Sequence, residues 1–130
     1  MLAPVETVVL VSGSGSNCEA VLAAASAGFC AVRVVAVVSD QPGAFGLERA
    51  RRRGIPTYAL PARGHASRAD HERAILAAIT PARPRLAVLA GYMRLVTPVL
   101  LGHFSPRHGA GTPPARINGL NGLVNAYDNN

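Results

Sequence analysis

The fold of this chain is decided by one stretch, Val8-Val9-Leu10-Val11-Ser12-Gly13-Ser14-Gly15-Ser16-Asn17. Its four aliphatic residues predict a buried strand, and a helical pattern begins directly after the small polar residues. Glycines in such a loop let the backbone approach a ligand closely, and the N–H groups at the start of the next helix attract anions. Ser16 and Asn17 are also candidate N-caps of that helix. The stretch therefore predicts a strand, an anion-binding loop and a helix.

The spacing of the glycines limits the kind of anion. Gly13-x-Gly15 lacks the third glycine of the dinucleotide-binding fingerprint, and no Gly-Lys-Ser/Thr follows as in a Walker loop. A monophosphate is therefore the favoured ligand. Short Gly/Ser turns also connect strands to helices without binding anything, and from these residues alone the two interpretations are equally supported.

Strand and helix patterns alternate along the chain after this stretch. Strand-like runs occur at Thr7–Val11, Val32–Ser39, Pro56–Leu60 and Leu86–Ala90, and helical spacing occurs at Asn17–Ala27, Ala44–Arg53, Ser67–Ile79 and Pro98–His103. Gly28 and Gly54 are expected to end the first two helices. The strands are continuous apolar runs, which is typical of strands covered on both faces. This predicts an α/β fold, a Rossmann-like open parallel sheet with right-handed crossovers.

The composition changes near Pro106, after which Gly, Pro and Asn dominate. We therefore divide the chain into an α/β subdomain, residues 1–106, and a segment predicted to be irregular or disordered, residues 107–130. A sheet that ends at its fourth strand indicates a C-terminally truncated domain. A shifted or prematurely ended reading frame and a fragment with a vector-derived tail both explain this pattern.

The composition limits the class of protein. The 130 residues are 49% hydrophobic and 15% charged, enough for one core. Because no apolar run approaches the ~18 residues that span a bilayer, we expect a cytoplasmic chain without a membrane partner. The net charge of +6 attracts anions. However, Arg51-Arg52-Arg53 ends a predicted helix and the aromatic residues are not interleaved with Arg, so no nucleic-acid partner is expected.

The cysteines and histidines do not form a recognisable metal or catalytic pattern. Cys18 and Cys30 flank a predicted helix without a CxxC pair, so both are interpreted as core or surface residues. His65, His71 and His103 are interpreted as surface or helix-face residues.

Three loops leave strands at the carboxyl edge of the predicted sheet, where open parallel sheets bind ligands. They are Ser12–Asn17, Ser39–Gly46 and Ala90–Leu95. The second is interpreted as a turn with Asp40 near a helix start. The third presents an aromatic ring, a thioether and a guanidinium, which suit a planar heterocycle. The same residues are equally consistent with a core Tyr and Met beside a solvated Arg.

Together these segments resemble the N-terminal half of the glycinamide ribonucleotide formyltransferase family, folate-dependent enzymes of purine synthesis. The resemblance covers residues 5 to about 107 and is most specific at Val9–Asn17, Ala44–Ala50, Ser67-Arg68 and Ala90–Leu95. It implies that Gly15, Ser16 and Asn17 hold the ribose phosphate of glycinamide ribonucleotide or another small phosphate ligand. It also implies a site for 10-formyltetrahydrofolate, the formyl donor, bordered by Arg68, Tyr92, Met93, Arg94, Leu95 and Val96.

The resemblance further implies that the glycinamide amine attacks the formyl carbon, assisted by an Asn, a His and a more distant Asp. The Asn and His belong to an Asn-x-His-Pro segment, and here Ala110 and Thr112 stand at their positions. Asn118 and His108 supply the residue types outside that motif, so we assign no catalytic residue. This chain alone is expected not to transfer formyl groups. A separate C-terminal half is a candidate partner, because it could complete the sheet at the edge beside Leu86–Ala90.

Two other functions stay open. One is a different folate-dependent formyltransferase of the same fold, such as a relative of methionyl-tRNA formyltransferase, which would be expected to have a different first loop and a tRNA-binding surface. The other is a non-catalytic phosphate-binding or interaction module. Titration with glycinamide ribonucleotide against a panel of other phosphates distinguishes them.

Overall fold

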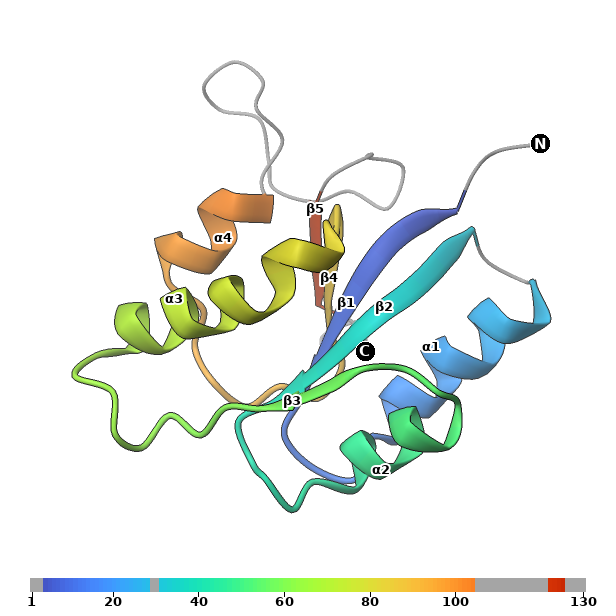
Figure 1. Cartoon of the computed structure of the whole chain (residues 1–130), viewed down its shortest axis with the longest axis horizontal. Coiled ribbons are helices and arrows are strands. Elements are labelled where there is room, and N and C mark those ends of the chain that lie inside the picture. Colours follow the sequence, from blue (N-terminus) through green and yellow to red (C-terminus); the bar gives the residue numbers. More distant parts are fainter. Residues whose placement is uncertain (1–3, 29–30, 105–121, 126–130) are drawn as a thin grey trace.

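The computed structural model describes residues 4–28, 31–104 and 122–125. Within these residues one parallel sheet contains β1 (Val5–Val11), β2 (Val32–Ser39), β3 (Thr57–Ala59), β4 (Leu86–Leu89) and β5 (Gly122–Asn125). The helices are α1 (Ser16–Ala27), α2 (Phe45–Arg52), α3 (Arg68–Ile79) and α4 (Pro98–Phe104), with a short 3-10 helix at Thr80–Ala82. The predicted α/β fold with a parallel sheet is confirmed (Figure 1).

The order of the strands, β3-β2-β1-β4-β5, places a switch point beside β1. The chain runs outward from β1 through β2 to β3 and then returns to the other side of β1 to form β4. Leu10 lies beside Leu89 in the register, so the ends of β1 and β4 are adjacent. The loops after these two strands therefore flank the crevice in which open parallel sheets bind ligands.

Helices cover both faces of the sheet, α1 and α2 on one side and α3 and α4 on the other (Figure 1). Successive residues of β1 point to opposite faces, as the pleat requires. Val9 and Val11 pack in the cluster that includes Leu22 and Leu47, whereas the cluster with Ile75 contains the alternate residues of β1. Because both faces are buried, Val8–Val11 of β1 is a continuous apolar run rather than an alternating one.

The predicted end of α1 is confirmed, whereas its predicted N-caps are not. Gly28, in the left-handed conformation with φ 79°, ends α1. The Ser67 hydroxyl caps α3 by accepting a hydrogen bond from the Asp70 N–H at 3.1 Å. The suggestion that Ser16 or Asn17 caps α1 is wrong, because both lie inside the helix.

The prediction that residues 107–130 are irregular is wrong for Gly122–Asn125. These residues form β5, which pairs with β4 and places Gly122 beside Leu86. A four-residue strand with two apolar residues between Gly122 and Asn125 is too short for periodicity to reveal, but the edge of β4 supplies backbone partners for it. The edge expected to be free is therefore occupied. The remainder of 107–130, the boundary at 106 and several residues considered above lie outside the described residues: Cys30, His108, Ala110, Thr112 and Asn118.

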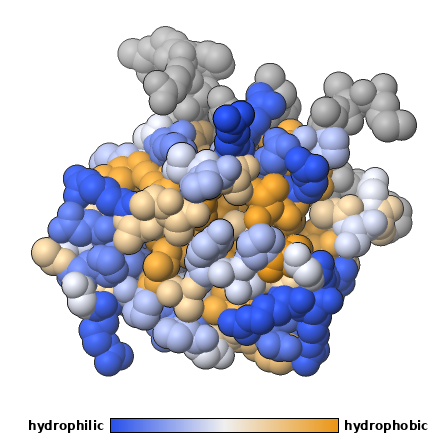
Figure 2. All heavy atoms as spheres, in the orientation of Figure 1, coloured by the Kyte–Doolittle hydropathy of each residue, from blue (hydrophilic) through white to orange (hydrophobic). Residues whose placement is uncertain are grey.

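The surface differs in character between regions. Figure 2 shows hydrophilic side chains gathered over α2 at the lower right, and apolar atoms at the surface in the middle of the view. The sequence of α2, FGLERARR, accounts for the hydrophilic area. None of the helices in the described part of the chain is long and apolar enough to cross a bilayer.

Candidate functional site

The loop between β1 and α1, with the first residues of α1, forms what we call the anion loop, Gly13–Asn17. Its carbonyl oxygens, which would repel an anion, are occupied by donors from the protein. The Gly13 oxygen accepts from the Gly46 N–H at 3.2 Å, and the Gly15 oxygen accepts from the Glu19 N–H at 2.7 Å. No side chain caps the first turn of α1. The N–H groups of that turn are therefore left for an acceptor from outside the helix.

A close contact between two glycines sets the shape of the anion loop. Gly15 is the N-cap of α1, in the left-handed conformation with φ 77° and ψ 27°. A Cβ at Gly15 would lie 2.5 Å from the Gly46 Cα, and a Cβ at Gly46 would lie 2.9 Å from a methyl group of Val11. The start of α2 thus supports the loop from behind, which explains why the Phe-Gly pair follows the first glycine loop at this distance.

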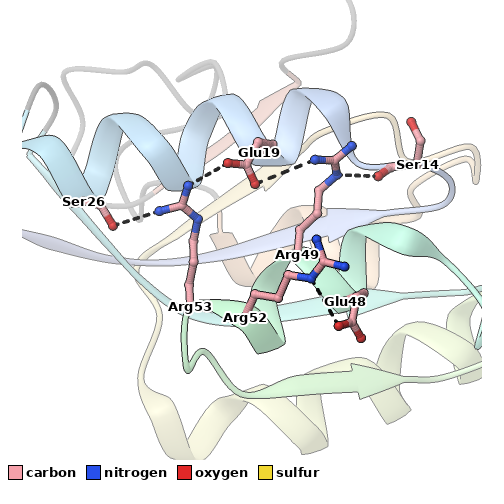
Figure 3. A network of polar contacts seen from close by, with 7 residues as sticks. All are labelled: Ser14, Glu19, Ser26, Glu48, Arg49, Arg52 and Arg53. Atoms are coloured by element: carbon pink, nitrogen blue, oxygen red, sulfur yellow. Dashed lines mark hydrogen bonds and ion pairs between the residues drawn. The ribbon is translucent and has the colours of Figure 1, made fainter.

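Arginines in and just after α2 join that helix to the anion loop and to α1 (Figure 3). Arg49 Nε donates to the Ser14 carbonyl oxygen at 2.8 Å, and Arg49 also lies 3.9 Å from a carboxylate oxygen of Glu19. Arg53, just after α2, pairs with Glu19 at 2.6 Å and donates to Ser26 at 3.3 Å. Arg53, one member of the basic cluster predicted to complement the end of a helix, therefore also joins the end of α2 to the first turn of α1.

The anion loop opens into a small hollow of about 140 Å³. Ala90, Gly91 and Met93, from the end of β4 and the loop after it, line its other side. This volume is below the roughly 300 Å³ of sites that enclose a drug-sized ligand, so the hollow suits a phosphate-sized group. The hollow is lined by uncharged residues, so backbone N–H groups and the hydroxyl and amide side chains of the loop are its donors.

A second cavity, of about 190 Å³, lies between α3 and the loop after β4. Four of the six residues predicted to border the folate site line it: Arg68, Tyr92, Arg94 and Leu95. Met93 instead faces the hollow of the anion loop with 65% of its surface exposed. Val96 is half-buried and packs against the core cluster on this face of the sheet. The sequence therefore predicts which segment borders the second cavity. The side chains of that segment lie in three places: the second cavity, the hollow of the anion loop and the core cluster.

Tyr92 forms the buried floor of this cavity. Only 8% of its surface is exposed, and burial, followed by the negative charge of Asp40, raises the pKa of its hydroxyl well above the usual range. Tyr92 therefore stays neutral at physiological pH and acts as an apolar surface with a single hydroxyl group.

Ser12, Asp40 and Arg94 join the ends of three neighbouring strands. The Ser12 hydroxyl donates to Asp40 Oδ1 at 2.7 Å and accepts from the Met93 N–H at 2.8 Å. Arg94 Nε donates to Asp40 Oδ2 at 3.0 Å. Asp40 directly precedes the turn Gln41–Ala44 and the start of α2, as predicted, but its side chain is 2% exposed and ion-paired with Arg94. The sequence signal that pointed to this cluster was the prediction that three loops meet at this edge of the sheet.

Two buried polar residues fix the wall of the second cavity. Glu72 accepts hydrogen bonds from the Thr97 N–H and hydroxyl and from the Leu100 N–H, at 2.6–2.8 Å, and so caps the start of α4. His71, predicted to lie at the surface or on a helix face, is 3% exposed. Its Nε2 lies 2.6 Å from the Leu60 carbonyl oxygen and ties the end of the β3 segment to α3. Both residues have structural partners that account for their burial.

Of the two interpretations of Cys18, core or surface residue, the structure shows the first. Its side chain is buried, and this burial raises the pKa of the thiol to about 11. Such a thiol is not a nucleophile near neutral pH. The described residues also contain no group of three or more His, Cys, Asp or Glu side chains that could hold a metal ion.

Comparison with known proteins identifies the family. The sequence profile of the family described as "Formyl transferase" matches residues 5–108. The chain belongs to this family. It is 41% identical over 100 residues to the phosphoribosylglycinamide formyltransferase of Escherichia coli strain K12, covering 77% of this chain and 47% of the relative. The chain therefore spans about half the length of that relative.

Solved structures agree with this assignment. The phosphoribosylglycinamide formyltransferase from Brucella melitensis matches with a TM-score of 0.74 and 39% identity, over 80% of this chain and 54% of that one. The enzyme of the same name from Bacillus halodurans matches with a TM-score of 0.75 and 32% identity, over 92% and 54% of the two chains. The resemblance drawn from the four motifs is confirmed at the level of the formyl transferase family and its fold. The roles of individual residues in the anion loop and the second cavity stay predictions.

Proposed function

We propose that this formyl transferase chain binds the two substrates of formyl transfer to glycinamide ribonucleotide. In this proposal Gly15, Ser16 and Asn17 bind the ribose phosphate. The donor, 10-formyltetrahydrofolate, lies along Arg68 and the segment Tyr92–Val96. One observation carries the proposal: the Met93 N–H donates to the Ser12 hydroxyl, and Met93 lines the hollow of the anion loop. An acceptor amine and a formyl donor must meet within van der Waals contact, so their binding segments must be neighbours.

The anion loop supports the phosphate part of the proposal. Its carbonyl oxygens are bonded to the protein, its helix start is uncapped, and its hollow is of phosphate size. The net charge of +6 draws anions toward the molecule. A phosphate bound by backbone N–H groups at a helix start needs no cationic side chain in the hollow.

The second cavity supports the folate part. A reduced folate has a flat heterocycle and an acidic tail. Arg68 and Arg94 line the cavity and offer two cations for carboxylates, while Tyr92 offers a buried ring face. Leu95, with 69% of its surface exposed, offers apolar cover for a ring. The cavity has about 190 Å³, less than a whole folate, so these residues form one wall of a site.

Bound 10-formyltetrahydrofolate supplies an electrophilic formyl carbon. The residues of this chain bind and orient the two reactants, and orientation contributes a large part of the rate of such two-substrate reactions. Formyl transfer also requires groups that stabilise the oxyanion and move protons. Losing one oxyanion donor costs about 10²–10³ in rate. Because Ala110 and Thr112 stand where the resemblance expects the Asn and His, we propose that this chain binds both substrates without transferring the formyl group.

Titration of the ¹⁵N-labelled chain tests the binding proposal. Glycinamide ribonucleotide should shift the amide signals of Gly15–Asn17 and bind more tightly than ribose 5-phosphate or inorganic phosphate. A stable reduced folate, 5-formyltetrahydrofolate, should shift the signals of Met93 and Arg94. Equal affinity for every monophosphate, with no response to folate, would instead support a phosphate-binding module. Binding of formyl-acceptor tRNA without binding of glycinamide ribonucleotide would support a methionyl-tRNA formyltransferase relative.

An assay for tetrahydrofolate release tests the absence of transfer. The purified chain should give no release above background with both substrates present. Turnover by the chain alone would contradict this expectation and direct attention to His108 and Asn118 as catalytic groups.

A further inference from the structure

Asp40 directly follows β2 at the sheet edge where both proposed ligands would bind, yet it lines neither the hollow of the anion loop nor the second cavity. Its side chain is 2% exposed, and a buried carboxylate is costly unless its oxygens are bonded. Here Oδ1 accepts from Ser12, and Oδ2 accepts from Arg94 at 3.0 Å and from Gln41 at 3.4 Å. Both oxygens of the carboxylate therefore accept hydrogen bonds, and the donors are side chains from three different loops.

The bonds of Ser12 and Asp40 hold the loop after β4 at two consecutive residues. Ser12 accepts from the backbone N–H of Met93, and Asp40 accepts from the side chain of Arg94. The first bond fixes the path of the backbone, and the second fixes the direction of the guanidinium. Arg94 is 39% exposed, so without Asp40 its side chain could turn into solvent.

The same hydroxyl sits at the base of the anion loop. Ser12 directly precedes Gly13, and its backbone N–H donates to the Gly91 carbonyl oxygen at 3.2 Å. A shift of the anion loop therefore moves Ser12, and with it the anchor of Met93 and the partner of Asp40. The hydrogen bonds run from one ligand-binding segment to the other without a gap.

We propose that Asp40 is a positioning residue that couples the two ligand segments, so that an anion bound at Gly13–Asn17 favours the arrangement of Met93 and Arg94 that binds the folate. This inference rests on the proposed function for its two ligands. Asp40 itself lines neither the hollow nor the second cavity, and it acts through Ser12 and Arg94. By linkage, folate must favour anion binding by the same factor.

The Asp40→Asn variant is the most informative change. An Asn keeps the size of the side chain and an oxygen that can accept from Ser12, but its NH₂ group faces the Arg94 Nε–H, so two donors meet. The link to Arg94 is lost while the link to Ser12 survives. Asp70→Asn is the matched control, because Asp70 pairs with Arg73 at 2.6 Å on the exposed surface of α3.

The experiment measures the affinity of the full chain for 5-formyltetrahydrofolate with and without saturating inorganic phosphate. In the unaltered chain and in Asp70→Asn, phosphate should tighten folate binding about fivefold or more. In Asp40→Asn the ratio should fall to within about twofold of one, while the affinity for phosphate alone changes by less than about twofold. Equal ratios in the unaltered chain and Asp40→Asn, or no coupling in the unaltered chain, would overturn the inference.

A second variant and a ligand-free measurement keep the test decisive. If Asp40→Asn does not fold, Ser12→Ala removes both hydroxyl bonds without touching the charge, and the same loss of coupling is expected. If the unaltered chain binds neither ligand, the proposed function fails. The network is then judged in the free protein: Asp40→Asn should shift the amide signals of both Ser14–Asn17 and Met93–Leu95. Shifts confined to the neighbours of residue 40 would overturn the inference.

Discussion

Substitution of Gly15 by Ala tests whether the close contact between the anion loop and α2 has the energetic weight that the structure assigns to it. Gly15 has φ 77°, and an L-residue in the left-handed region costs about 1–2 kcal/mol. The new Cβ would lie 2.5 Å from the Gly46 Cα, whereas ordinary contacts of this kind begin at 3.4 Å. Such overpacking adds roughly 1–3 kcal/mol. The free energy of unfolding should therefore fall by about 2–5 kcal/mol.

Gly54 provides a matched control for the backbone term. It has φ 72°, but a Cβ there would meet no atom within 4 Å. Gly54→Ala should therefore lose only the backbone part, about 1–2 kcal/mol. The difference between the two variants isolates the contact with Gly46. Urea unfolding followed by circular dichroism measures both values.

Phosphate binding is the second measurement on the same variants. Relief of the clash displaces Gly15 from Gly46 and disturbs the N–H groups at the start of α1, so Gly15→Ala should lose most of its affinity for phosphate. Ser14→Ala should bind phosphate nearly as the unaltered chain does, because it removes one of several donors of the hollow and keeps the backbone carbonyl that accepts from Arg49. If Gly15→Ala and Gly54→Ala lose equal stability, or if Gly15→Ala binds phosphate normally, the reasoning about this loop is refuted.

Three further changes examine the supports of the site. Arg49→Met removes the donor to the anion loop and should weaken phosphate binding about two- to tenfold in calorimetry, whereas Arg51→Met should not; similar affinities for the two variants would contradict the role of the bridge. Glu72→Gln leaves one donor at the start of α4 facing an NH₂ group and should lower the free energy of unfolding by about 1–3 kcal/mol, against a few tenths for the exposed Glu48→Gln; equal losses in urea titrations would be evidence against the buried cap. The pKa of Cys18 is raised to about 11 from 9.0, so the folded state holds the thiol proton more tightly than the unfolded state. Its contribution to stability is complete below pH 9 and is lost as the pH rises toward 11, and the unaltered chain should lose about 2–3 kcal/mol more than Cys18→Ala over that interval. Parallel pH profiles for these two proteins would show that the thiol is not desolvated.

Most of the fold could be predicted from the sequence because burial on both faces leaves a strong pattern. β1, β2 and β4 are mostly apolar, and their predicted positions agree with the structure to within two residues at each end. β3 is the weakest case, since only Thr57–Ala59 of the predicted five residues pair with β2. Its residues are half-buried or exposed, so the pattern there is faint.

Local backbone geometry was harder to predict. Gly15 is the N-cap of α1 and adopts a left-handed conformation. Ser16 and Asn17 are residue types that favour the N-cap position, so the sequence wrongly predicts the cap at one of them. β5 has four residues, and its pairing depends on the edge of β4, which lies more than thirty positions earlier in the chain. A pattern confined to neighbouring residues does not contain that information.

The candidate site likewise could be predicted in its location but not in its side-chain contacts. The sequence predicts that the loops after β1, β2 and β4 meet at one edge, and they do. It does not predict that Ser12, Asp40 and Arg94 bond to one another, because they are separated by 28 and 54 positions and each has an ordinary solvent-exposed or turn interpretation. Their contacts follow from the register of three strands, which local spacing does not determine.

The proposed function places substrate binding and formyl transfer on different parts of the chain. The switch point lies between β1 and β4, so both ligand segments that we propose come from residues 13–96. We therefore expect substitutions in those residues to act on binding and on the coupling between ligands, independently of the groups that stabilise the oxyanion. A C-terminal half supplied as a separate chain meets a different obstacle, because β5 already pairs with the edge of β4. It must either displace those four residues or add to their outer edge. Since each backbone hydrogen bond contributes only about 0.5–1.5 kcal/mol, displacement of so short a strand is energetically accessible.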